Sequence, residues 1–280
     1  MRLLLVKILF LAVFILTLPG CETLGNLFSK EKETDRAEYA GWNEAEFHQK
    51  AKEAMDAGAY EKAIKIYEAL EARYPFGDYA AQTQLDIAYA YHKNGDYEAA
   101  VAAADRFLKI NPRNPSIDYA YYLKGLVNYN RGYGLIDRYL PIDSAQRDTS
   151  YAKDSLSIFQ ELLRRFPNSK YVGDAKQRVI ALRNNLAMHE LHIAEYYLKR
   201  KAYVAAVSRS NFIVQEYQKT SAIPGALKVM QAAYAALGLQ SLASDAQRVY
   251  DANYAKGVSA ATNQPGSLVY DTWDFLGLDK

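Results

Sequence analysis

The chain has little of the chemistry that builds metal sites or cross-linked scaffolds. Its 280 residues include one cysteine, Cys21, and four histidines. A single thiol excludes an internal disulfide framework and any metal site made of several thiolates. Hydrophobic residues make up 50% of the chain and charged residues 24%, which is typical of a folded body and not of a disordered or multispanning protein. We therefore expect packed side chains to hold the fold together.

An excess of one charge sign is also missing. Lys and Arg number 34 against 32 Asp and Glu, a net charge of +2. Arg2 and Lys7 lie in a segment that we expect to be removed, and subtracting them leaves 32 basic against 32 acidic residues. Proteins that bind nucleic acid need a clustered basic excess to neutralise phosphates. The neutral balance therefore predicts no nucleic-acid partner.

The hydrophobic segment near the start is too short to span a membrane. Arg2 and Lys7 precede an apolar run from Ile8 to Leu18, eleven residues long. A transmembrane helix needs about 20 such residues, whereas a charged start followed by a short apolar core is typical of a signal peptide. We predict that residues 1–20 direct export and are then removed.

The end of this segment resembles a lipoprotein processing site. Leu18-Pro19-Gly20-Cys21 is similar to the lipobox of bacterial lipoproteins, in which the cysteine thiol takes a diacylglyceryl group and becomes the new N-terminus. Stable attachment takes more than one acyl chain, and a mature lipoprotein carries three. Glu22 follows the cysteine, which by resemblance to lipoprotein sorting implies the periplasmic face of the outer membrane. The alternative is a plain signal peptide with an incidental cysteine.

Signatures of catalysis are absent from the sequence. It contains no Gly-x-Ser-x-Gly elbow, phosphate-binding glycine loop or dinucleotide fingerprint. The nearest candidate is His189-Glu190-Leu191-His192, but its histidines are three residues apart and not four as in the zinc-protease helix, and no further ligand follows. Exposed histidines on a long helix are the interpretation that we prefer. The sequence predicts no enzyme, no metal and no cofactor.

What the sequence does contain is an internal repeat. Its clearest copies share a turn residue, a tyrosine, small residues and a closing proline: Gly58, Tyr60, Ala63, Tyr67 and Pro75, then Gly95, Tyr97, Ala100, Ala104 and Pro112. Ala63 and Ala100 are 37 residues apart, close to the tetratricopeptide period of about 34. Weaker copies are Ser155 with Phe159 and Pro167, Tyr203 with Ala206 and Ile213, and Gly238 with Ala243 and Tyr250.

Such a repeat predicts helical hairpins in which small residues sit where two helices cross and a proline ends the second helix. Ala51 and Ala88 supply the small residue of the first helix in the first two pairs. We predict an all-α solenoid of about five tetratricopeptide-like hairpins, ten helices in all, stacked as a right-handed superhelix over residues 43–255. A lipidated Cys21 with a flexible tether, residues 21–42, precedes it. The repeat cannot bury its apolar face alone, so stability comes from neighbouring repeats.

Two stretches depart from the period. Residues 131–149 contain Gly132, Gly134 and Pro141, which forbid a continuous helix and predict an inserted loop. A single long helix from about Ser169 to Arg200 accounts for the second departure. Helix starts are also marked: Asn43 with Glu46 three residues later predicts a capping box, and Asn114-Pro115 predicts a cap followed by a first-turn proline.

Tyrosine is abundant, at 24 of 280 residues. Many tyrosines fall on the first helices of the hairpins, which line the concave side of such arrays. The repeat frame places Gln82, Leu85, Tyr89, His92, Lys93, Tyr119, Tyr122, Leu126 and Tyr129 on that inner face. Tyrosine provides rigid contact area together with a hydroxyl group, which suits the binding of extended or aromatic-ended peptides. The alternative is that individual tyrosines pack between helices.

The last 25 residues differ in composition from the repeats. Gly257, Ser259, Asn263, Pro265 and Gly266 predict a linker, and the apolar cluster from Val269 to Leu276, which contains Trp273, follows it. This linker and aromatic tail, residues 256–280, is predicted either to dock on a partner or to fold back and cap the array. A tail without any contact is the remaining alternative.

Several short motifs lie along the repeats: Arg73-Tyr74-Pro75-Phe76-Gly77, Leu85-Asp86-x-Ala88-Tyr89-Ala90-Tyr91, Asp105-Arg106-Phe107, Ile117-Asp118-Tyr119, Arg147-Asp148, Pro167-Asn168-Ser169 and Ala194-Glu195-Tyr196-Tyr197. They resemble the BamD family, the tetratricopeptide lipoproteins of the outer-membrane β-barrel assembly machinery. With the lipobox, the resemblance covers residues 18 to about 254. The segment from 256 to 280 is longer than the family leads us to expect.

The resemblance implies a non-enzymatic adaptor that holds the periplasmic domains of the BamA subunit, with other lipoproteins of the machinery, and binds C-terminal segments of unfolded barrel proteins. It implies substrate contact at Tyr89, His92, Tyr119 and Tyr122, beside a linker shaped by Arg73 and Phe76. Arg209 points outward in the repeat frame and either pairs with an acidic partner or is solvated. Alternatives are another periplasmic tetratricopeptide lipoprotein acting in secretion or division, and an accessory protein of a cell-wall hydrolase or protease.

Overall fold

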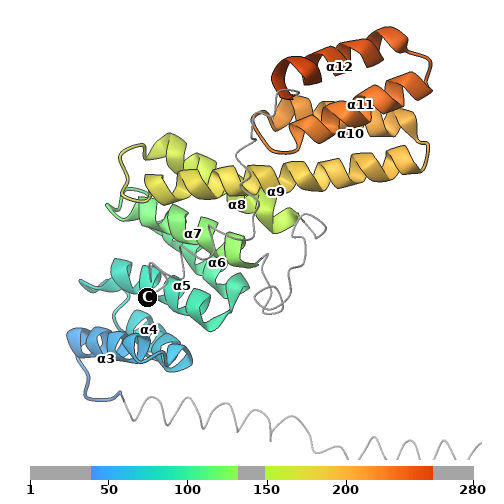
Figure 1. Cartoon of the computed structure of the whole chain (residues 1–280). Helices are drawn as coiled ribbons and strands as arrows, with labels where there is room; N and C mark the ends of the chain where they lie inside the picture. Colours follow the sequence, from blue (N-terminus) through green and yellow to red (C-terminus); the bar gives the residue numbers. More distant parts are fainter. Residues whose placement is uncertain (1–38, 132–148, 255–280) are drawn as a thin grey trace, which may run out of the picture.

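A computed structural model describes residues 39–131 and 149–254, and these residues form ten helices without a strand (Figure 1). The helices are α3 (Glu44–Asp56), α4 (Tyr60–Arg73), α5 (Ala80–Asn94), α6 (Tyr97–Ile110), α7 (Ile117–Arg131), α8 (Ser150–Arg165), α9 (Val172–Lys199), α10 (Tyr203–Glu216), α11 (Ile223–Ala236) and α12 (Gln240–Tyr254). Each helix packs mainly on the helices before and after it in the chain. The predicted class, an all-α solenoid of helical hairpins, is confirmed.

The hairpins close through left-handed turn residues. Gly58, Gly95 and Gly238 have φ of 73°, 88° and 75° between the two helices of their pairs. In each turn the next amide bonds back to a carbonyl five residues earlier, as Asp96 N–H does to Tyr91 C=O over 2.9 Å. This arrangement satisfies carbonyl groups that a helix end leaves open. The turn between α9 and α10 has the same hydrogen bond but uses Lys201, with φ of 60°, in place of glycine.

Small residues occupy the helix crossings that the repeat predicts. Ala51, Ala63, Ala88 and Ala100 are completely buried. Larger apolar residues fill the space beside them, including Phe107 and Phe159, which are also completely buried. The core is therefore a series of small clusters between successive helices, as expected when each repeat depends on its neighbours.

The two predicted helix starts have different outcomes. Asn43 forms the predicted capping box: its side chain accepts from Glu46 N–H at 3.0 Å, and Glu46 accepts from Asn43 N–H at 2.8 Å. The prediction at Asn114 is wrong, because α7 begins only at Ile117. Asn114 instead forms a turn in which its side chain accepts from Ser116 N–H at 2.8 Å, so Pro115 lies before the helix and not in its first turn.

The predicted long helix is α9, with 28 residues. It packs against α8 with its first half and against α10 and α11 with its second, so it connects the two halves of the array (Figure 1). Within the described ranges, no helix combines the length and apolar content that crossing a bilayer requires. The signal peptide, the lipidation site at Cys21, the inserted loop and the tail 256–280 lie outside the described residues, apart from the ends of the loop.

Candidate peptide-binding surface

The tyrosines predicted on α7 belong to a ring cluster with a third tyrosine. The rings of Tyr122 and Tyr171 stack, with centroids 4.5 Å apart and an interplanar angle of 14°. Tyr119 lies 5.5 Å from the same Tyr171 ring. Burial raises the pKa of the Tyr119 and Tyr122 phenols well above the usual value, because both hydroxyls are partly removed from water. Both rings are partly buried, so they serve packing and present only part of their surface.

The predicted residues on α5 lie next to this cluster. Tyr89 and Tyr119 pack against the same buried residues around Leu123 and Val127. The Tyr89 and His92 rings are 6.4 Å apart, and a His92 ring nitrogen lies 3.4 Å from the side-chain nitrogen of Asn130 on α7. The structure therefore brings residues from two successive hairpins together. We call Tyr89, His92, Tyr119, Tyr122 and Tyr171 the aromatic surface.

One predicted inner-face residue does not belong to this surface. Leu85 is only 2% exposed and packs with Phe107 and Ala120. The reason is that α6 and α7 both contact α5 and close over this side of it. Leu85 is therefore a core residue, and its placement on the inner face is wrong.

A polar network borders the aromatic surface toward α3. The Asp86 carboxylate lies 3.2 Å from His48 Nε2 and accepts from the Gln82 amide at 2.7 Å. Burial raises the pKa of Asp86, and the hydrogen bonds from Gln82 and His48 oppose that rise only in part. The His48 ring also stacks on Tyr79, with centroids 4.6 Å apart. The sequence gives no local pattern for this network, because His48 and Asp86 are 38 residues apart.

A second polar pair borders the aromatic surface toward α9. Arg178 Nε donates to Asp174 Oδ2 over 2.6 Å, and both side chains are mostly buried. The guanidinium also lies 4.7 Å from the centre of the Tyr129 ring, a cation–π distance. Tyr129 was predicted on the inner face. In the structure its ring lies against the Arg178 guanidinium.

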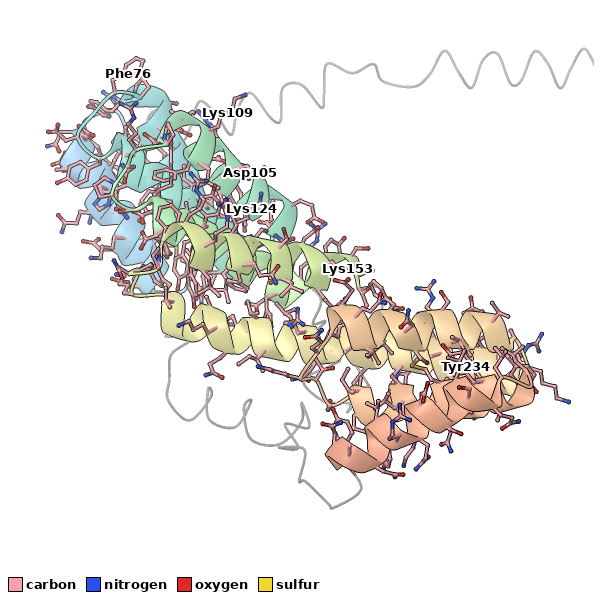
Figure 2. The ribbon with its side chains drawn as sticks, turned by 90° about the horizontal axis from the view of Figure 1, so that it is seen from above. Phe76, Asp105, Lys109, Lys124, Lys153 and Tyr234 are labelled. Atoms are coloured by element: carbon pink, nitrogen blue, oxygen red, sulfur yellow. The ribbon has the colours of Figure 1, made fainter. Side chains whose placement is uncertain are left out.

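Arg73 ends α4 and Phe76 lies on the connection from α4 to α5, and the two side chains have different surroundings. Arg73 donates from its two terminal nitrogens to the carbonyls of Tyr39 and Ala40, at 3.0 and 3.3 Å. It therefore holds the chain that leads into α3. Phe76 is 98% exposed and stands at one end of the array (Figure 2). An aromatic side chain left in solvent at a loop tip is available for contact with another molecule.

Arg209 lies on α10, in the opposite half of the array (Figure 1). It donates from Nη1 to Glu190 Oε2 of α9 over 3.0 Å. The Arg209 side chain is 45% exposed, whereas that of Glu190 is 7% exposed. A partner for Arg209 within the chain was not predicted, because the two residues are 19 positions apart on antiparallel helices.

The histidines near Glu190 give no sign of a metal site. In the part of the chain that the structure describes, no group of three or more His, Cys, Asp or Glu side chains is arranged to hold a metal ion. Glu190 points to Arg209. The described residues form a surface of rings and hydroxyl groups bordered by ion pairs, which is suited to binding. Among them, we identify no arrangement of nucleophile and base.

Comparison with known proteins identifies the family. The chain matches the family YfiO, described as outer membrane lipoprotein, over residues 42–249. The outer membrane protein assembly factor BamD of Neisseria meningitidis serogroup A is 36% identical over 250 residues, which cover 89% of this chain and 92% of the relative. This chain belongs to the BamD family.

Other BamD proteins agree with this assignment. The assembly factor BamD of Haemophilus influenzae is 38% identical over 211 residues, or 75% of this chain and 80% of the relative. That of Vibrio cholerae is 37% identical over 195 residues, or 70% and 81%. The family resemblance predicted from the sequence motifs is confirmed. The aromatic surface, Phe76 and Arg209 all lie within the range matched by the family.

Proposed function

We propose that this chain is a non-enzymatic lipoprotein that takes part in outer membrane protein assembly. Membership of the BamD family carries the proposal, because the relatives are named as assembly factors. The hairpin solenoid supports it, since such arrays present extended binding surfaces. The first experiment is isolation of the protein from a detergent extract of its own cells. A large barrel protein of the BamA type should co-purify with it. Recovery of a secretion or cell-wall assembly without a barrel subunit would favour the alternative adaptor functions.

Attachment to the outer membrane is proposed to occur through lipid on Cys21, at the periplasmic face. The lipobox-like sequence and Glu22 support this assignment. Cys21→Ser should move the protein from the membrane fraction to the soluble fraction of the periplasm. If the variant stays in the membrane fraction when no barrel subunit is bound, another attachment exists and the lipid proposal fails.

The aromatic surface is proposed to bind the C-terminal segments of unfolded barrel proteins. Tyr89 and His92 on α5 and Tyr119 and Tyr122 on α7 provide rings and hydroxyl groups in one place. Phe76 adds an exposed ring at the neighbouring loop. An extended, aromatic-ended peptide fits this combination, because rings pack on rings while hydroxyls bond to open backbone groups.

Site-specific photo-crosslinking tests the binding surface. A crosslinking residue at position 89 or 76 should capture a synthetic peptide with the C-terminal sequence of a barrel protein. Position 212 is the matched control, because Phe212 is an exposed aromatic residue on α10 in the other half of the array. Position 122 is less suitable, since a large substitution there breaks the stack with Tyr171. Equal capture at 89, 76 and 212 would contradict a localised site.

The C-terminal hairpins are proposed to face the periplasmic domains of BamA and other lipoproteins of the machinery. Arg209 is the candidate contact, because its guanidinium is half-exposed while Glu190 fixes its position. Arg209→Lys should retain part of the co-purification of BamA, and Arg209→Ala should reduce it further. Unchanged recovery of BamA with both variants would remove Arg209 from the interface.

A further inference from the structure

The last helix of the array, α12, and the turn before it expose large apolar side chains. Leu239, Leu242 and Val249 are 46%, 43% and 45% exposed. Leu242 and Val249 are seven residues apart, so they lie on one side of α12. The final unit of a repeat array normally presents a polar outer face to water. At this end of the array, burial of these apolar side chains against another segment would therefore be favourable.

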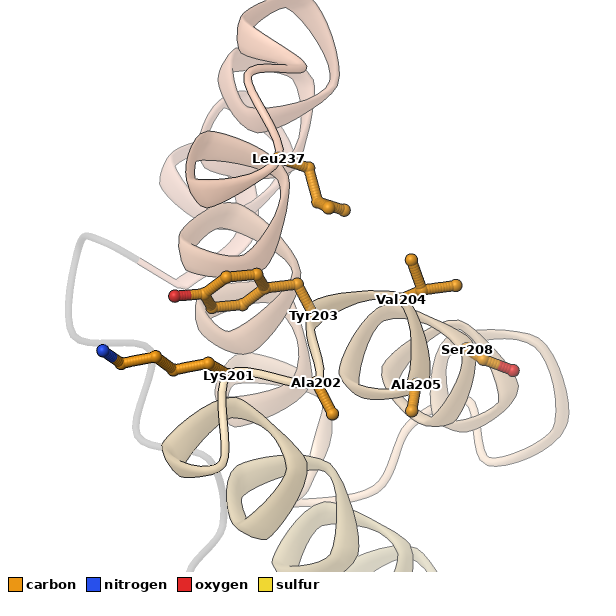
Figure 3. Close-up of a pocket in the computed structure, with 7 residues that line it drawn as sticks. All are labelled: Lys201, Ala202, Tyr203, Val204, Ala205, Ser208 and Leu237. Carbon is orange, nitrogen blue, oxygen red and sulfur yellow. The ribbon is translucent and has the colours of Figure 1, made fainter.

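A second apolar area lies at the tips of the last two hairpins, where α10 begins and α11 ends. An open depression of about 540 Å³ lies between the start of α10 and the turn that joins α11 to α12 (Figure 3). Val204, which is 71% exposed, and Leu237, which is 39% exposed, line it. We call Val204, Leu237, Leu239, Leu242 and Val249 the end face. Several large apolar side chains that lie together in water mark a binding surface.

We propose that the end face is the docking site of this chain's own tail, residues 268–276. That segment contains six apolar or aromatic residues, among them Trp273 and Phe275. Thirteen residues, 255–267, separate it from the end of α12. They reach up to about 45 Å when extended. The 15 residues of α12 span only about 22 Å, so the tail can return along the whole helix to the depression.

Charge also favours the tail over other occupants. Three consecutive basic residues are exposed here: Lys199 at the end of α9, and Arg200 and Lys201 in the turn that leads to α10. Lys201 lines the depression. The tail contains Asp271 and Asp274 and no basic residue between Lys256 and Lys280. A second copy of the array would bring an identical basic turn against this one. The short connection also raises the local concentration of the tail at the end face far above that of any separate chain.

The fluorescence of Trp273 tests the proposal in the full mature chain carrying Cys21→Ser. The chain has only two tryptophans, Trp42 and Trp273, so subtracting the spectrum of a Trp273→Phe variant isolates Trp273 emission without changing Trp42. The docked tail predicts blue-shifted emission and protection from acrylamide quenching, both independent of protein concentration. Solvent-like emission of Trp273 would overturn the proposal, and protection that appears only at high concentration would mean that a second copy occupies the end face.

Substitutions on the end face locate the docking site. Leu242→Asp and Val204→Asp should each lower the docking equilibrium constant by roughly tenfold or more, because each replaces an apolar contact with a charge. Arg200→Glu should also weaken docking, and its effect should be larger at low salt than at high salt. Ile110→Asp is the matched control, since Ile110 is an exposed apolar residue on α6, and it should leave Trp273 protected.

Two further results would contradict the assignment. Protection of Trp273 that survives both Leu242→Asp and Val204→Asp would place the tail elsewhere on the protein. Protection that appears only after addition of lipid vesicles would make the tail a membrane-binding segment. The proposal does not depend on binding of barrel proteins, and none of these measurements requires a partner or a substrate.

Discussion

The ring of Phe159 on α8 occupies the space beside Gly125 on α7. A Cβ atom at position 125 would lie 2.7 Å from the nearest ring atom of Phe159, closer than real carbon contacts allow. Ser155, one turn before Phe159, donates from its hydroxyl to the Gly125 carbonyl over 2.9 Å. Glycine therefore lets the two helices of the third hairpin approach closely, and a completely buried ring fills the contact.

We expect Gly125→Ala to lower the free energy of unfolding by roughly 1–2 kcal/mol. Overpacking costs about 1–3 kcal/mol, and the better helix propensity of alanine returns up to about 1 kcal/mol. Urea unfolding of the chain carrying Cys21→Ser measures the change. Gly173→Ala on α9 is the control, because nothing lies within 4 Å of its Cβ position, and it should be neutral or stabilising. Equal effects of the two substitutions would show that α7 and α8 are not in close contact.

Ala100 makes a second close crossing, between α6 and the neighbouring helices. It is completely buried, so Ala100→Leu should destabilise the protein by about 1–3 kcal/mol and lower the melting temperature. Ala102→Leu places the same side chain on the exposed side of α6 and should have little effect. An unchanged thermal melt of the Ala100→Leu variant would contradict the assignment of Ala100 to a crossing.

The ion pair of Arg209 with Glu190 predicts a non-additive pair of substitutions. Arg209→Ala leaves a carboxylate that is only 7% exposed without its hydrogen-bond donor, and we expect a loss of about 1–3 kcal/mol. Adding Glu190→Gln removes the buried charge and should restore part of that stability. Urea unfolding of both variants measures the difference. A double variant that is less stable than Arg209→Ala would show that Glu190 is stabilised by other groups.

Burial of Asp86 predicts a specific pH dependence. Its pKa is higher in the folded protein than in the unfolded chain, so the folded state binds more protons between the two values. The stability contributed by this group is full below the unfolded pKa of about 3.9 and is lost as pH rises through the higher folded pKa. The wild type should therefore lose stability relative to Asp86→Asn as pH rises from about 4. Urea unfolding of both proteins between pH 4 and pH 7 measures this difference, and a difference that grows in the other direction would contradict it.

Features with a short-range or periodic signal could be predicted from the sequence. Asn43 and Glu46 are three residues apart, so their capping box depends only on local backbone geometry. The alanines of the crossings recur with the repeat, because every pair of helices meets in the same way. The turn glycines follow from the same repetition. Asn114 shows the limit of such local rules, since its side chain bonds within a turn and α7 starts three residues later.

Features that join distant residues were found only in the structure. Tyr171 precedes α9 and is not in the predicted frame of the inner face, yet it stacks on Tyr122 of α7. Leu85 fits the period of that face, but α6 and α7 cover it. In both cases the deciding contact comes from another repeat, and the period of one helix carries no information about what lies across from it.

The sequence by itself determined that this protein is a stack of helical hairpins, because that fold follows from small residues and turn residues at a regular spacing. Its motifs, and not the spacing of the repeats, carried the resemblance to the BamD family. Only the tertiary structure decided which of its polar and aromatic side chains meet. It pairs Arg209 with Glu190, gathers tyrosines from separate repeats and leaves Leu242 and Val249 of α12 exposed. The physical reason is that burial and pairing depend on distances between repeats, and those distances are set by how the helices pack.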